Sequence, residues 1–199
     1  MNVEPNVKRS KNLITWSGIY LATSWLVVVS GFLNSDPNQF VFTDLLVVVL
    51  IPVSIVTFVV NFRWVRSLII TARQIQPEGI GYRQGWAFWS WVTPIAAFFI
   101  PRRLIMRPFE CFAGFTGRSN ILATNLWWGF FIASGVMDNL SFRAGLGTSE
   151  LVPFFDLLSA IFLTIAFPQW KVIIETVTSA QAASLEQLSS SHLSSSPQE

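Results

Sequence analysis

The feature that most constrains this chain is a set of long apolar runs. Residues 13–33 carry no charged side chain, and a helix of this length extends about 31 Å. The hydrocarbon core of a bilayer is about 30 Å thick, so the run matches one membrane-spanning helix. Further apolar runs cover 40–62, 121–140 and 151–170. Each of the four predicts a membrane span.

Composition agrees with lipid as the main solvent. Hydrophobic residues make up 52% of the 199 residues and charged residues only 12%, whereas about a quarter of a soluble domain is charged. We therefore predict an all-α fold, a polytopic transmembrane helix bundle. Its expected parts are a cytoplasmic basic arm (1–12), a transmembrane helical domain (13–188) and a disordered Ser-rich tail (189–199). The second span is expected to continue as a helix to about Gln76.

Residues 86–112 are the ambiguous stretch. Its apolar part, 86–100, is short for a full span. Pro94, Pro101 and Pro108 recur through it, and each internal proline removes a helical hydrogen bond. No single straight helix is therefore expected here. We predict a Pro-broken re-entrant or interfacial element; the alternative is a fifth span.

The distribution of positive charge favours four spans over five. With the N-terminus inside and five spans, eight cations fall on the inner side and five on the outer side. With four spans, 12 of the 13 fall inside, and only Arg143 is outside. Cytoplasmic segments of membrane proteins are enriched in Lys and Arg, so the second arrangement is preferred. It puts both termini in the cytoplasm.

Three aspartates in the predicted spans form the first candidate site. Asp44, Asp138 and Asp156 each lie a few residues from the outer end of a span in the four-span arrangement. A shared depth would let them line an outward-facing vestibule and bind a cation or relay a proton. The alternative is simple hydration, with Asp44 and Asp156 placed in first helical turns where the helix dipole favours negative charge.

Arginines and tryptophans form the second candidate site. The residues are Arg102, Arg103, Arg107, Trp86, Trp89 and Trp91. Guanidinium groups bind phosphates through paired donors, so anionic lipid headgroups are the expected partners. On a helix Glu110 would pair with Arg107 three residues before it. The alternative is ordinary positive-inside anchoring without a specific lipid.

The residues needed for other chemistry are scarce. There is one cysteine, Cys111, and one histidine, His192, which excludes metal sites built from several Cys or His ligands. No Gly-rich phosphate loop, Ser/His/Asp set, HExxH or CxxC is present, so we predict no cofactor, no metal and no catalytic residue. Nucleic-acid binding is not expected either, because the basic residues adjoin lipid. Ala133, Ser134 and Gly135 would allow close helix approach and a homo-oligomer.

Several motifs occur in an order that resembles a known family. They are Asn61-Phe-Arg-Trp-Val-Arg66, the Trp-rich stretch from Gln84 to Pro94, Pro101-Arg-Arg103, Trp127-Trp128-Gly129, and Val177-Thr-Ser-Ala-Gln181. Together they are similar to the bacterial membrane-protein family catalogued as domain of unknown function 4328. The resemblance implies a multi-pass protein of the bacterial cytoplasmic membrane and no known activity.

Two functions follow as hypotheses. The first is a non-enzymatic accessory subunit that contacts lipid or a protein partner through its Arg/Trp element. The second is a small transporter or channel subunit that uses the membrane-embedded aspartates.

Overall fold

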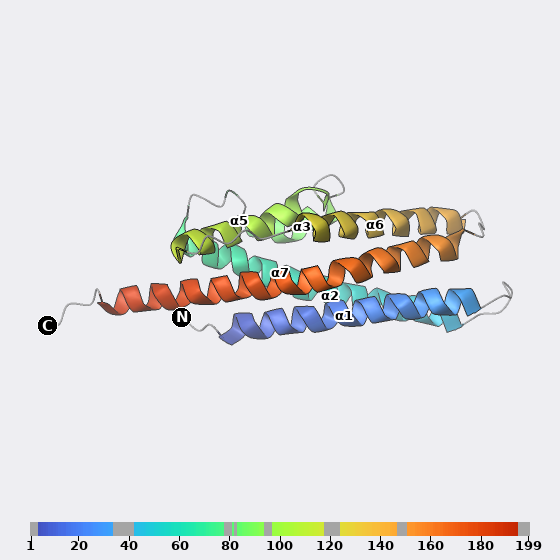
Figure 1. Ribbon diagram of the computed structural model, residues 1–199, viewed down its shortest axis with the longest axis horizontal. Coiled ribbons are helices and arrows are strands. Elements are labelled where there is room, and N and C mark those ends of the chain that lie inside the picture. Colours follow the sequence, from blue (N-terminus) through green and yellow to red (C-terminus); the bar gives the residue numbers. More distant parts are fainter. Residues whose placement is uncertain are drawn as a thin grey trace. The chain divides into compact units, whose positions relative to one another are not determined.

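The computed structural model describes residues 4–33, 42–77, 81, 83–93, 97–117, 124–146 and 151–194. Within these residues the regular structure is helical, with no strand (Figure 1). The helices are α1 (Glu4–Leu33), α2 (Phe42–Ile75), α3 (Trp86–Val92), α5 (Ile100–Phe115), α6 (Asn125–Leu146) and α7 (Val152–Ser194). The predicted all-α class is confirmed.

Three helices are long and apolar enough to cross a membrane, over Asn6–Leu33, Phe42–Ile75 and Val152–Ser190. The chain is therefore a multi-pass helical membrane protein. α6, which was also predicted to span, is not one of the three. It has 22 residues, but Asn125, Asp138 and Asn139 lower its mean hydropathy.

Helix ends differ from the prediction in three places. α1 begins at Glu4, so residues 4–12 of the expected basic arm are helical. α6 continues to Leu146, past the predicted end of its span at residue 140. α7 continues to Ser194, beyond the expected start of the tail at residue 189; residues 195–199 lie outside the described residues. α2 ends at Ile75, close to the predicted end.

The prolines of residues 86–112 act in different ways. The prediction that no single straight helix covers this stretch is confirmed, because α3 and α5 are separate helices. Pro101 lies in the first turn of α5, where its missing N–H costs no helical hydrogen bond. Pro108 lies inside α5 and does not end it. Pro94 lies outside the described residues.

The chain divides into two compact units, which we name by their chemistry. The apolar unit comprises residues 14–59 and 124–171, and the basic unit comprises residues 1–13, 60–123 and 172–199. By sequence the basic unit holds eleven of the thirteen cations and six of the eleven acidic side chains, a net charge of +5. The apolar unit holds two cations and five acidic side chains, a net charge of −3.

The basic unit has a core like that of a water-soluble helical domain. Among the described residues, the largest fully buried side chains all belong to it: Leu13, Trp64, Val65, Leu68, Ile69, Leu104, Ile105, Phe112, Ile173, Ile174, Gln181 and Leu185. They come from α1, α2, α5 and α7. Burial of this kind removes apolar area from water and stabilises the unit.

Hydrogen bonds fix the register of α2 against α7 inside the basic unit. The Trp64 indole N–H donates to Thr178 Oγ1 at 3.1 Å. Gln181 Nε2 donates to the Ser67 carbonyl at 3.2 Å and to Thr71 Oγ1 at 2.8 Å. Trp64–Thr178 and Ser67–Gln181 are both separated by 114 residues, so the two helices run parallel here in one constant register.

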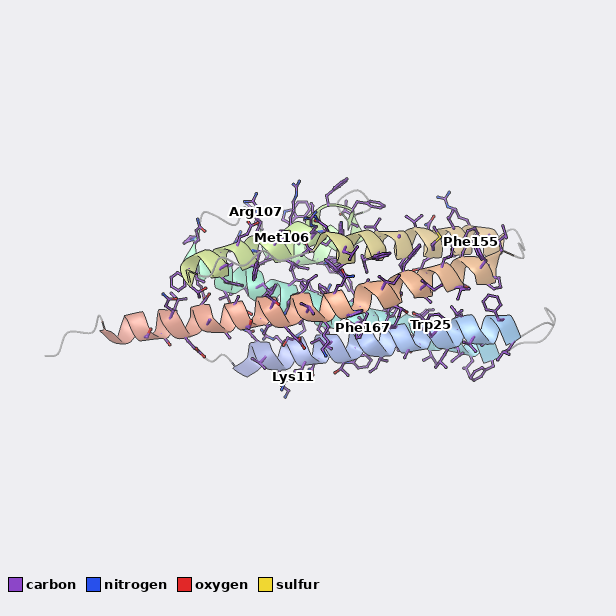
Figure 2. The ribbon with its side chains drawn as sticks, in the orientation of Figure 1. Lys11, Trp25, Met106, Arg107, Phe155 and Phe167 are labelled. Carbon is purple, nitrogen blue, oxygen red and sulfur yellow. The ribbon has the colours of Figure 1, made fainter. Side chains whose placement is uncertain are left out.

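The apolar unit is joined across its helices by a few polar contacts. The Trp25 indole N–H donates to Thr164 Oγ1 at 2.9 Å, between α1 and α7, and Thr57 Oγ1 donates to the Trp16 carbonyl at 3.2 Å, between α2 and α1. Figure 2 shows Trp25 and Phe167 in the layer between α1 and α7. Small polar contacts of this kind are typical of helix packing in membranes.

The surface of the apolar unit is the reverse of that of the basic unit. Twenty-one of the 28 exposed large hydrophobic side chains described lie in it, among them Leu26, Phe32, Val48, Ile55 and Phe142. Apolar exposure on this scale is rare on a soluble monomer, and it is what a lipid-facing surface requires.

We predict that the same substitution has opposite consequences in the two units. Phe112 in the basic unit is fully buried, whereas Phe142 in the apolar unit is 68% exposed. Phe112→Ala should lower the free energy of unfolding in detergent by about 3–5 kcal/mol because it opens a cavity. Phe142→Ala should change it by less than about 0.5 kcal/mol. Thermal melting of both variants in detergent measures the change in stability. Equal destabilisation by the two substitutions would contradict the assignment of Phe112 to a core and of Phe142 to a lipid-facing surface.

Candidate functional site

The amphipathic helix α5 carries the predicted arginines. Its buried residues follow helical spacing along one face: Pro101, Leu104, Ile105, Pro108, Phe109, Phe112 and Ala113. Arg103 and Arg107 are exposed and Arg102 is half-buried. Figure 2 shows Arg107 on the outer side of α5. We call Arg102, Arg103 and Arg107 the arginine face.

Two contacts hold the apolar face of α5 in the basic unit. Cys111 Sγ donates to the Ala72 carbonyl of α2 at 3.6 Å. The Ser184 hydroxyl of α7 lies 3.5 Å from the Phe112 carbonyl of α5. Because other helices cover the apolar face of α5, its charged face is the exposed one.

The short helix α3 packs against α5. Ala87 and Ser90 are fully buried on one face of α3. Trp86, Phe88 and Trp89 are exposed on its surface, with Trp89 at 58%. Phe88 makes edge-on ring contacts with Phe62 of α2 at 6.1 Å and with Trp89 at 5.4 Å, so the exposed rings sit on an ordered base.

Two more aromatic side chains are exposed directly before α5. Phe98 is 47% exposed and Phe99 is 63% exposed. Of the seven exposed large hydrophobic side chains described in the basic unit, five are aromatic residues between 86 and 99. We call Trp86, Phe88, Trp89, Phe98 and Phe99 the aromatic patch.

The structure changes the predicted Arg/Trp constellation in two respects. Trp91 is half-buried, with its indole nitrogen shielded, and it does not belong to the exposed patch. The structure describes no contact between Arg107 and Glu110, so their pairing stays a prediction. Phe88, Phe98 and Phe99 were missed, because within an apolar run they could not be told from residues of a span.

Two of the three predicted aspartates come together in the apolar unit. The Asp138 carboxyl is hydrogen-bonded to the Ser159 hydroxyl, and the Asp156 carboxyl to the Ser141 hydroxyl. The Ser134 and Ser159 hydroxyls are 2.8 Å apart. We call these five residues the α6–α7 seam.

The two carboxyls of the α6–α7 seam are close enough to interact electrostatically, and Tyr20 of α1 is close to Asp138. Asp44 is exposed near the start of α2, and none of the interactions described for Asp138 or Asp156 involves it. The buried serines at 141 and 159 carried no distinct sequence signal. The seam gives Asp138 of α6 a hydrogen-bonding partner on α7.

The described residues contain no group of three or more His, Cys, Asp or Glu side chains that could hold a metal ion. His192 lies in α7, but its side chain is outside the described part. Cys111 is half-buried, and its burial raises the pKa of the thiol.

In comparisons with known proteins, no family model, no curated protein and no solved structure matches this chain. The resemblance to domain of unknown function 4328 therefore stays a prediction.

We predict that Cys111 reacts slowly with a maleimide. A raised pKa leaves less thiolate at neutral pH, and the thiolate is the nucleophile. The control is Gly114→Cys in a Cys111→Ser background, because Gly114 is exposed and a Cβ there meets nothing within 4 Å. The rate for Cys111 should rise at a higher pH than the rate for the control. Superimposable pH–rate curves would contradict the burial of Cys111.

Proposed function

We propose that the chain is a four-span, non-enzymatic protein of the bacterial cytoplasmic membrane, with both termini inside. In this proposal the apolar unit crosses the bilayer, and the basic unit contacts lipid headgroups or a protein partner at the cytoplasmic face. The observation that carries it is the opposite distribution of exposed and buried apolar side chains in the two units.

The lengths of the helices within the apolar unit support four spans. The segments are 14–33, 42–59, 125–146 and 152–171, which contain 20, 18, 22 and 20 residues. At 1.5 Å per residue each extends about 27–33 Å, the thickness of a hydrocarbon core. α6 belongs to this unit, and the polar side chains of its seam bond to α7, so its lower hydropathy is compatible with a span.

The position of residues 86–112 supports an interfacial element rather than a fifth span. This stretch belongs to the basic unit. α3 has seven residues, far too few to cross a bilayer. α5 buries its apolar face against α2 and α7 and presents arginines on the other. Eleven of thirteen cations in one unit also accord with a cytoplasmic location of that unit.

Single cysteines can test the topology without altering any charge. We select Gly114, Gly145 and Ser179, which are all exposed, in a Cys111→Ser background that keeps a donor to the Ala72 carbonyl. A Cβ at Gly114 meets nothing, and one at Gly145 meets Val152 at an ordinary 3.9 Å.

With four spans, a membrane-impermeant maleimide labels Gly145→Cys in intact cells, and labels Gly114→Cys and Ser179→Cys only after permeabilisation. Five spans reverse all three results. Since every position changes sides, a single experiment separates the two topologies, and labelling before and after permeabilisation serves as the internal control.

A second function, a small transporter or channel subunit, is favoured by one observation. Asp138 and Asp156 lie together in the α6–α7 seam, and paired carboxylates inside membranes often mark ion or proton paths. The same two carboxyls are hydrogen-bonded to serines of the seam. We therefore assign them a role in packing α6 against α7.

We therefore expect no proton or cation flux from the reconstituted protein above that of empty vesicles. The variants Asp138→Asn and Asp156→Asn should behave like the wild type, and Asp44→Asn is the matched control outside the seam. A flux that both seam variants abolish and the control retains would establish the transport function instead.

A further inference from the structure

We propose that the aromatic patch and the arginine face together bind an anionic phospholipid of the bilayer, with the rings at the boundary of headgroups and acyl chains and the guanidinium groups on phosphate. This inference rests on the proposed function, because it places the basic unit beside the membrane. It deepens that function by naming the ligand as a lipid with a net negative headgroup.

The aromatic patch has the composition and shape of a surface that enters a membrane interface. Its residues are five of the seven exposed large hydrophobic side chains described in the basic unit. Trp is enriched at the level of lipid headgroups, where one end of the ring is apolar and the other polar. α3 turns Ala87 and Ser90 toward the protein, so it lies along a surface with its rings outward, as an interfacial helix does.

The arginine face supplies the complementary charge next to the patch. α3 packs directly on α5, and Phe99 immediately precedes α5. Because the apolar side of α5 is buried in the core, its arginines stay on the outer side of the helix. Arg binds phosphate through two parallel donors, which Lys cannot do. The basic unit also carries a net charge of +5, which attracts an anionic membrane surface.

A bilayer fits this surface better than a soluble anion or a nucleic acid. The five aromatic rings need an apolar partner, whereas an inorganic phosphate would engage only the arginines. A phospholipid supplies the phosphate and the acyl chain in one molecule. An anionic headgroup adds attraction to the basic unit that a zwitterionic headgroup lacks.

The test measures binding of individual lipids to the full chain in detergent by native mass spectrometry. The probes are phosphatidylglycerol and phosphatidylcholine. The variant Arg103→Gln with Arg107→Gln removes two exposed charges from the arginine face. The variant Arg63→Gln with Arg66→Gln removes two exposed charges from α2 of the same unit and serves as the matched control.

The wild type should bind phosphatidylglycerol more tightly than phosphatidylcholine. The Arg103/Arg107 variant should weaken phosphatidylglycerol binding about 25-fold, at roughly fivefold for each of the two lost cations, while phosphatidylcholine binding changes little. The Arg63/Arg66 control should retain the preference. The double variant Trp86→Ala with Trp89→Ala should weaken the binding of both lipids, because it removes apolar contacts that both lipids make.

Equal affinity of the wild type for the two lipids would overturn the proposal. An equal loss of phosphatidylglycerol affinity in the Arg63/Arg66 control would also overturn the proposal. The net positive charge of the basic unit would then explain the lipid preference without a specific site. The exposed positions keep the core intact, and an unchanged melting temperature verifies folding. Lipid preference in detergent does not depend on topology, so its failure is distinct from a failure of the cysteine labelling.

Discussion

The structure of the basic unit depends on the parallel contact between α2 and α7. Trp64, Gln181 and their partners hold these helices in one register, although 110 or 114 residues separate the two partners of each hydrogen bond. α5 then docks on both helices through Cys111 and Phe112, and α3 packs on α5. The exposed arginines and aromatic rings lie on α5, on α3 and in the segment just before α5, which pack on α2 and α7. Their positions therefore depend on the register of α2 against α7.

The two units use similar apolar residues for opposite purposes. In the basic unit Leu104 and Ile173 are buried and their shape matters, because a core is packed at high density. In the apolar unit Val48 and Ile55 are exposed, and in lipid they need only be apolar. With no hydrophobic drive between lipid-facing helices, contacts such as Trp25–Thr164 and Ser134–Ser159 supply the specificity.

Much of the fold was predictable where one physical rule dominates. Lipid solubility demands long uncharged runs, which gave the helical class, and the cationic segment after residue 62 was expected to remain helical, as α2 does. The helix ends were harder. Residues 189–194 are mostly polar and were predicted to form a tail, but they extend α7, because helical hydrogen bonding does not require an apolar face. Pro108 was one of the prolines predicted to break the helix. Its buried ring instead packs in the core, and α5 continues through it.

The candidate sites were predictable by residue type but not by partner. Arginines beside tryptophans were evident, whereas the exposure of Phe98 and Phe99 depends on how α5 docks. The pairing of Asp138 with Ser159 depends on the register of α6 against α7, which no local pattern encodes. Neither helix shows a periodicity that distinguishes a seam serine from any other small residue.

The core of the basic unit is also discontinuous in sequence, and this has a consequence for biosynthesis. Its parts come from the beginning, the middle and the end of the chain. The apolar face of α5 cannot be fully covered until Ser184 of α7, which lies against the Phe112 carbonyl, has left the ribosome. Synthesis proceeds at about 5–20 residues per second, so Leu104 and Phe112 remain exposed for several seconds after they emerge. A chain that ends before residue 172 lacks the α7 part of this core and leaves that side of α5 uncovered.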